Sequence, residues 1–108
     1  MVEAVQVQLK KGVLELCVLA LLSRGDAYGY EIASRLAKGI EMGEGTIYPL
    51  MRRMQADSLV DTYLVESASG PSRKYYRLTA AGAARFAAQK TEWTAFSGAV
   101  NAILGGAQ

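Results

Sequence analysis

The sequence predicts one mainly α-helical domain with a single small β-hairpin. Apolar residues recur at helical spacing in three short segments between residues 9 and 58, and they alternate with polar residues between residues 60 and 79. Helical spacing then returns between residues 80 and 104. The chain has 108 residues, of which 51% are hydrophobic and 20% charged, so it can build one packed core.

The composition excludes several classes of function. The chain has no histidine and one cysteine, Cys17, which rules out histidine-dependent catalytic triads, an internal disulfide and a thiolate-rich zinc site. We therefore expect no enzyme, no metal and no cofactor. The apolar run between Val13 and Leu22 is shorter than the roughly 20 residues that span a bilayer. We expect a cytoplasmic protein without membrane insertion.

The first two predicted helices lie at 9–23 and 28–38. The first is apolar on most of its circumference, which predicts burial on most sides. Gly25 is expected to end it in the left-handed conformation, and Asp26 is expected to cap the second helix. Gly39 is expected to end the second helix.

A third helix is predicted at 46–58. Pro49 lacks a backbone N–H and is tolerated in the first turn of a helix, so it places the helix start at or near Thr46. The residues spaced to face the core are Ile47, Leu50, Met51 and Met54.

Two strands and a last helix follow. The strands are expected at 60–65 and 73–79, joined by a turn of Gly, Pro and Ser at 67–72. The last helix is expected at 80–104, with a seven-residue repeat carried by Phe86, Trp93 and Val100 and by Phe96 and Ile103. This helix packs either on its own core or across a two-fold axis. We favour the two-fold axis, because so short a chain buries little surface alone.

The order helix, helix, helix, strand, turn, strand is that of a winged helix-turn-helix. Two crossed helices present the third to the major groove, and the hairpin brings cations to the phosphates. The net charge is only +2, but five cations and no acid lie between residues 71 and 90: Arg73, Lys74, Arg77, Arg85 and Lys90. We expect a DNA-binding unit at 1–79 and a dimerisation helix at 80–108, forming one compact unit.

The third helix offers the first set of DNA contacts. Tyr48, Pro49, Arg52 and Arg53 are spaced to point away from the core. Arginine donates paired hydrogen bonds to guanine edges or phosphates, and a tyrosine hydroxyl bonds to a phosphate. Thr46 would cap the helix near a phosphate. The alternative is that Arg52 and Arg53 only solubilise a surface helix.

The wing offers the second set. Arg73 and Lys74 follow the Gly-Pro turn, where they would project toward phosphates or a minor groove. The alternative is that they guard an edge strand against pairing with other chains. Tyr28 is expected to be a packing residue that can also reach a phosphate.

Several sequence strings together resemble the PadR family of transcriptional regulators. They are the segments at 12–15, 28–32 and 44–50, which includes Gly-Thr-Ile-Tyr-Pro, and at 69–79, which includes Gly-Pro-Ser-Arg-Lys-Tyr-Tyr-Arg-Leu-Thr. The resemblance covers residues 10–104 and extends to Trp93, typical of short members with one C-terminal helix. The chain departs from the pattern at Ser58, where members usually carry glycine.

The resemblance implies a homodimeric winged-helix repressor that binds a palindromic operator. The DNA contacts that it implies are Thr46, Tyr48, Pro49 and Arg52 in the third helix and Arg73 and Lys74 in the wing. In some multidrug-sensing members, paired tryptophans line an apolar pore between the subunits. If Trp93 is equivalent, it would stack on a small planar aromatic effector, with Phe96 and Val100 extending the wall. The alternative is that Trp93 only fills the dimer seam.

A second function stays open at this point. A winged helix can use the same face to bind a protein instead of DNA, and the last helix can pair with a foreign helix. The alternative is thus a protein-interaction module without sequence-specific DNA binding.

Overall fold

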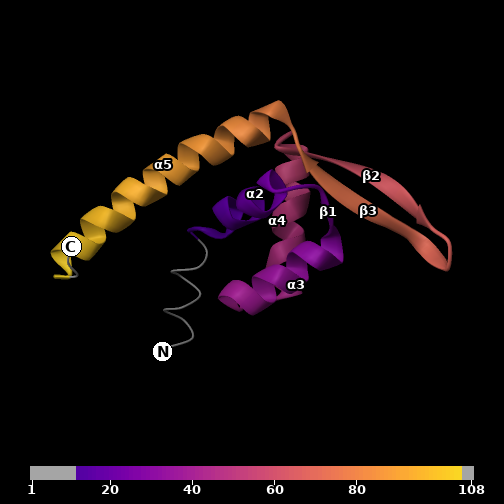
Figure 1. Cartoon of the computed structure of the whole chain (residues 1–108), viewed down its shortest axis with the longest axis horizontal. Coiled ribbons are helices and arrows are strands. Elements are labelled where there is room, and N and C mark those ends of the chain that lie inside the picture. The colour runs from indigo at the N-terminus through magenta and orange to yellow at the C-terminus, as the bar shows by residue number, and fades with distance from the viewer. Residues whose placement is uncertain (1–11, 106–108) are drawn as a thin grey trace.

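The computed structural model describes residues 12–105, and it confirms the mainly α-helical fold with a small β-hairpin. Within these residues the order is α2 (Leu14–Ser23), β1 (Ala27–Tyr28), α3 (Gly29–Ile40), α4 (Glu44–Ala56), β2 (Val60–Ser67), β3 (Gly70–Leu78) and α5 (Ala80–Ile103). The three strands form an antiparallel sheet in the order β1-β3-β2. Helices α3 and α4 form the helix-turn-helix, and β2 and β3 form the wing (Figure 1).

The core lies where α2, α3 and α4 meet the base of the sheet. Its largest fully buried side chains are Val18, Leu19, Ile32, Ile47, Met51, Met54 and Val60. The predicted inward residues of the third helix are all buried, which confirms the predicted periodicity of this helix. No polar or charged side chain is buried within the described residues.

Four predicted helix ends were wrong, and one of them is the end of α4, which lies at Ala56 rather than at residue 58. Helix α2 begins at Leu14 rather than at residue 9, and residues 9–11 lie outside the described range. Helix α3 continues through Gly39 to Ile40, because Glu41, with a φ of 58°, makes the left-handed turn instead. Helix α4 begins at Glu44, so Pro49 stands in its second turn. Because Pro49 has no N–H, the carbonyl of Gly45, four positions earlier and exposed, lacks its helical hydrogen-bond partner.

The expected caps were also wrong. Gly25 has a φ of 147°, which is not the left-handed helical value. Asp26 does not cap α3, because β1, a strand that the sequence did not predict, comes between them. Pairing with β3 holds Tyr28 extended, so the helix starts at Gly29 without a side-chain cap. Helix α4 likewise begins after Gly43, and the Thr46 side chain is not its cap.

The junction of α4 and β2 seats the start of α5. Ser58 has a φ of 61°, a left-handed conformation that glycine adopts most easily. The Thr79 hydroxyl donates to the Ser58 carbonyl at 2.7 Å and accepts from the backbone N–H of Gly82 at 2.9 Å. A β carbon on Gly82 would overlap the Leu59 carbonyl oxygen. Serine at position 58 therefore keeps the backbone turn that glycine favours.

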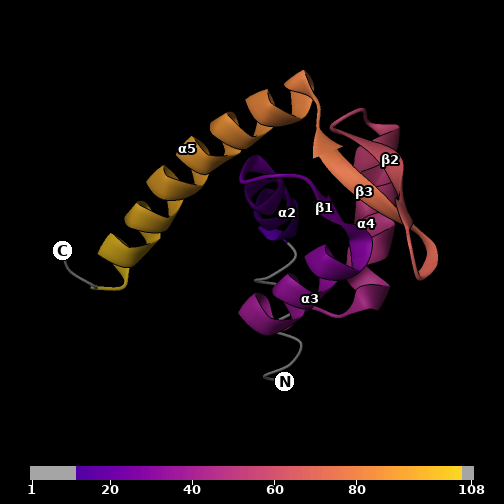
Figure 2. The same ribbon diagram turned by 45° about the vertical axis from the view of Figure 1, so that its right-hand side comes forward.

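Helix α5 and the wing start close together and extend toward opposite sides of the body (Figures 1 and 2). The molecule measures 54 × 33 × 23 Å along its principal axes. The start of α5 packs on the body, where Phe86 lies against the core. Further along, Trp93, Phe96 and Ile103 are 45%, 64% and 85% exposed. Within the described part of the chain, the second half of α5 therefore has an uncovered apolar side.

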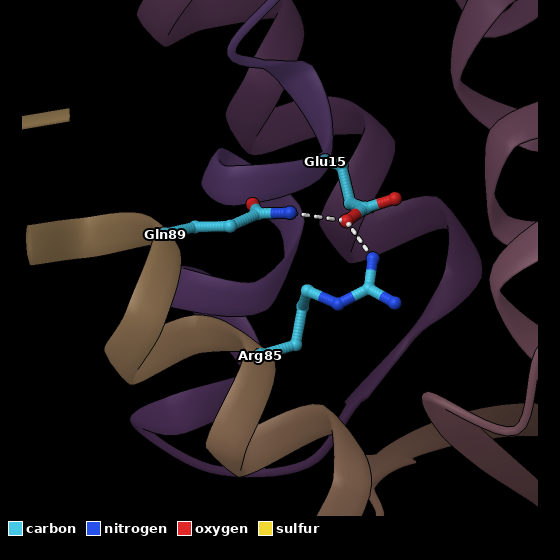
Figure 3. A network of polar contacts seen from close by, with 3 residues as sticks. All are labelled: Glu15, Arg85 and Gln89. Carbon is cyan, nitrogen blue, oxygen red and sulfur yellow. Dashed lines mark hydrogen bonds and ion pairs between the residues drawn. The ribbon is translucent and has the colours of Figure 1, made fainter. Parts of the chain in front are cut away.

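A polar network holds α5 to α2 (Figure 3). The Oε2 atom of Glu15 accepts hydrogen bonds from Arg85 at 3.1 Å and from Gln89 at 2.6 Å. Arg85 and Gln89 lie one turn apart on the same side of α5, so one carboxylate engages both. Gln89 interrupts the apolar repeat because it makes this contact. Within residues 12–105, no helix combines the length and apolar character needed to cross a membrane.

Candidate nucleic-acid interface

A groove separates the recognition helix α4 from the wing, and it contains four of the eight predicted DNA contacts. Its volume is about 460 Å³. The residues that line it, here called the wing groove, are Tyr28, Gly29, Tyr30, Tyr48, Arg73, Lys74 and Tyr76. Helix α3 contributes its first residues, α4 contributes Tyr48, and β3 contributes the two cations and Tyr76. Aromatic rings beside cations are the side chains that contact sugar and phosphate.

Gly29 allows this groove to form. A β carbon at this position would lie 3.3 Å from Cε1 of Tyr48, closer than ordinary van der Waals contact. A side chain at position 29 would therefore require the ring of Tyr48 to shift by a few tenths of an ångström. In the sequence string Tyr-Gly-Tyr at 28–30, one tyrosine thus precedes and one follows the glycine that makes this close approach.

The remaining predicted residues of α4 do not line this groove. Thr46, Pro49 and Arg53 line a separate hollow with the start of α2. All three are exposed, as is Arg52. Burial raises the pKa of Tyr76, and the positive charge of Arg52 offsets part of this rise, so Arg52 lies near this tyrosine of β3. The predicted residues of α4 therefore lie on two sides of the helix, and the eight predicted residues do not form one cluster.

The surroundings of Tyr48 and Tyr76 favour the neutral, hydrogen-bonding form of these two side chains. Burial raises the pKa of Tyr48, and the negative charge of Glu44 adds to this effect. Burial also raises the pKa of Tyr76, more than Arg52 lowers it. A protonated hydroxyl donates a hydrogen bond, and so suits a phosphate oxygen.

Arg73 and Lys74, the two wing cations that line the groove, lie on opposite faces of the hairpin, because neighbouring residues on a strand alternate. The guanidinium of Arg73 lies 4.6 Å from the ring centre of Tyr28. The ammonium of Lys74 lies 5.7 Å from the ring centre of Tyr76. Both distances are those of cation–π contacts. The wing cations are thus held against aromatic rings rather than free at the hairpin tip.

The predicted effector residues lie elsewhere. Trp93 and Phe96 line a hollow of about 420 Å³ between α2 and α5, together with Glu15, Arg53 and Glu92. Val100 is not among the residues that line this hollow. Arg53, predicted as a DNA contact, borders both this hollow and the one beside Thr46.

Sequence reasoning missed several residues of this surface. Tyr30 and Tyr76 complete the wing groove, and Asp26 accepts a hydrogen bond from Tyr63. Gly-Tyr pairs near a helix start could have pointed to Tyr30. The other contacts join residues far apart in the chain, and no local pattern records them.

The fold and the groove define a winged helix-turn-helix protein with a cationic, tyrosine-rich face. The profile of the family described as "Transcriptional regulator PadR-like family" matches residues 18–88, well over half of the chain. This chain belongs to the PadR-like family of transcriptional regulators. It is therefore a transcriptional regulator and not an enzyme.

Solved structures resemble the chain over most of its length. A PadR-like transcriptional regulator from Bacillus cereus strain ATCC 14579 is 42% identical, with a TM-score of 0.84 over 93% of this chain and 99% of that one. A PadR family transcriptional regulator from Eggerthella lenta DSM 2243 is 33% identical, with a TM-score of 0.83 over 98% and 94%. The structure of Bacillus subtilis PadR in complex with operator DNA shares the fold at 23% identity, with a TM-score of 0.64 over 71% and 45%.

Proposed function

We propose that this regulator binds operator DNA through the wing groove and the exposed side of α4. The observation that carries this proposal is the convergence of Tyr28, Tyr48, Arg73 and Lys74 between the recognition helix and the wing. The Bacillus subtilis PadR that shares the fold is itself in complex with operator DNA. A regulator must reach the DNA, so we expect it in the cytoplasm.

The contacts divide by chemistry. Arg73 and Lys74, with the hydroxyls of Tyr28 and Tyr48, would hold the phosphate backbone and fix the register of the protein on the duplex. Arg52 would read a base edge in the major groove, where arginine pairs with guanine. Thr46, Pro49 and Arg53, on the other side of α4, would contact the opposite backbone strand.

The test is a fluorescence anisotropy titration with a duplex taken from upstream of the gene that encodes this chain, at several salt concentrations. Arg73→Ala should weaken binding to all sequences and lower the salt slope by about one, because one phosphate contact is lost. Arg24→Ala removes the same charge outside the wing groove and is the matched control. Equal effects of the two variants would contradict the assigned surface.

Arg52→Ala separates base reading from backbone contact. We expect a loss of about 1–3 kcal/mol on the preferred duplex and a smaller loss on random DNA. Equal losses on both would show that Arg52 only contacts phosphates. A folded, unaltered protein that binds neither duplex at low salt would favour the protein-interaction module.

We propose further that the chain forms a homodimer through α5. The exposed apolar residues Trp93, Phe96 and Ile103 follow one another at spacings of three and seven, so they share one side of the helix. Two copies joined there by a two-fold axis would present two recognition helices to a palindromic operator. Bound at a promoter, such a dimer would act as a repressor by excluding the polymerase.

The mass in solution, from light scattering coupled to size-exclusion chromatography, tests the dimer. The unaltered chain should have twice the 11.6 kDa mass of one subunit. Phe96→Asp combined with Ile103→Asp should give a monomer. Leu64→Asp is the control, since Leu64 is 69% exposed on the wing and not on α5. A monomeric unaltered protein, or an equal effect of Leu64→Asp, would contradict the proposed seam.

The hollow beside Trp93 supports a further part of the proposal, a small planar aromatic effector. Trp93 and Phe96 offer stacking faces there, and Glu15 and Glu92 are acidic. Trp93 is the single tryptophan of the chain, so its fluorescence reports on the hollow. Quenching by an aromatic compound that also weakens DNA binding supports the effector role. Quenching without a change in DNA affinity would contradict coupling between the two sites.

A further inference from the structure

A connected set of side chains covers the outer face of the wing sheet, and the proposed DNA contacts use only one end of it. At the other end, the hydroxyl of Tyr63 on β2 donates to Oδ2 of Asp26 at 2.6 Å. Asp26 directly precedes β1, and β3 lies between β1 and β2 in the sheet. The hydrogen bond therefore links the two outer strands across the central one.

The set continues from Tyr63 to Arg73 through aromatic contacts. The ring of Tyr63 stacks on that of Tyr75 with centres 5.7 Å apart and planes inclined by 22°. Tyr75 contacts Tyr28 at 5.5 Å between centres. Arg73 lies over Tyr28 at 4.6 Å. A side chain already held in place loses less conformational entropy when it binds a partner.

The wing needs such a connection because its pairing with the rest of the body is short. Strand β1 has two residues, which pair with Tyr75 and Tyr76 of β3. The chain joins the wing sheet to the helix-turn-helix at two places: helix α3 begins directly after β1, and α4 leads through residues 57–59 into β2. The first of these links is the two-residue strand β1. A bond from Asp26 to β2 strengthens this link where the backbone pairing ends.

We propose that Asp26 and Tyr63 are positioning residues, which orient the wing and hold Arg73 for its contact with DNA. This inference rests on the proposed DNA-binding function. Asp26 and Tyr63 are called the wing brace below. A different hydrogen bond links the wing to α4: the side chain of Gln55, on α4, donates to the Thr62 hydroxyl at 3.3 Å. The wing brace does not include this bond.

The sign of a charge effect makes the test sharp. Removing an acidic residue from a DNA-binding protein should strengthen binding, since repulsion from phosphates falls. The wing brace predicts the opposite for Asp26→Ala: affinity about fivefold weaker, as expected for losing one hydrogen bond. Asp26→Asn keeps an oxygen acceptor and should bind more tightly than Asp26→Ala. Tyr63→Phe keeps the stacked ring and should also lose about fivefold.

A double-mutant cycle shows whether the wing brace acts through Arg73. The affinity for the upstream duplex is measured for Tyr63→Phe, Arg73→Ala and the combined variant, with melting curves to establish that each is folded. In the Arg73→Ala background, Tyr63→Phe should change affinity less than twofold. A purely structural role would not make the effect of Tyr63 depend on Arg73.

The outcomes separate the two proposals. An unaltered chain that does not bind the duplex overturns both. Binding by the unaltered chain with no loss in Tyr63→Phe, or with the same loss in both backgrounds, overturns the wing brace alone. Stronger binding by Asp26→Ala also overturns it, and this variant keeps the test open if Tyr63→Phe does not fold.

Discussion

Single atoms at the junction of α4, β2 and α5 decide how the last helix leaves the body. Gly82 lies against the Leu59 carbonyl, and Thr79 both caps α5 and bonds to Ser58. In the sequence, Gly82 is only a glycine in the first turn of the predicted last helix. Glycine is required here because the Leu59 carbonyl oxygen leaves no room for a β carbon. No helical pattern in the sequence reveals this contact.

Replacing Gly82 by alanine should destabilise the fold by about 1–3 kcal/mol, the range for overpacking, despite the better helix propensity of alanine. Gly39→Ala, in α3, is the matched control, because a β carbon there meets nothing within 4 Å. That variant should be unchanged or more stable by up to about 1 kcal/mol. Urea unfolding at one protein concentration measures both. Similar changes in the two variants would contradict the close packing of Gly82 against the Leu59 carbonyl.

Residue types also compete for partners in ways that local rules do not settle. An aspartate before a helix predicts a cap, but Asp26 accepts from Tyr63 on a distant strand instead. The tyrosines and cations of the wing groove were partly predictable. Tyr48 is spaced to point away from the core, and Arg73 and Lys74 follow a turn. Tyr76 was not predictable, since it joins the groove only because the fold brings residues of β1, α3, α4 and β3 together.

At the scale of elements, the helices were predicted because their apolar periodicity is local. The two-residue strand β1 was missed, since it exists only through its pairing with β3. The attachment of α5 was missed for the same reason. It depends on Glu15, which accepts hydrogen bonds from two residues 70 and 74 positions away in the chain.

Glu15→Gln should loosen α5 from α2. The amide keeps one oxygen but loses the negative charge, which makes the bonds to Arg85 and Gln89 weaker by about 1 kcal/mol in total, given that the pair is partly exposed. Hydrogen exchange should then show lower protection in the first turns of α5, with little change in α4. Glu92→Gln, on the same hollow, is the control. Unchanged protection of α5 would show that the hydrogen bonds of Glu15 do not hold α5 to α2.

The whole molecule should lose stability at alkaline pH. The pKa of Cys17 is raised from its ordinary value of 9.0, and those of Tyr48, Tyr63 and Tyr76 are raised from 10.0. Burial is the main cause for Cys17, Tyr48 and Tyr76, and the bond to Asp26 for Tyr63.

Each of these groups therefore holds its proton more tightly in the folded state. Their contribution is fully present below about pH 9 and is lost as the pH rises through the raised values. Urea unfolding should show lower stability at pH 11 than at pH 8, with a smaller difference in Tyr76→Phe. Equal or higher stability at pH 11 would contradict the raised pKa values of Cys17 and the three tyrosines.

Across the whole molecule, the account depends on one surface, the wing groove with the adjoining side of α4. Amide NMR spectra of the labelled protein, recorded during titration with the upstream duplex, locate the bound surface directly. We expect the largest shifts at Tyr28, Tyr48, Arg52, Arg73 and Lys74, and small ones at Arg24 and at the exposed end of α5. Shifts confined to α5, with the wing and α4 unchanged, would contradict the account.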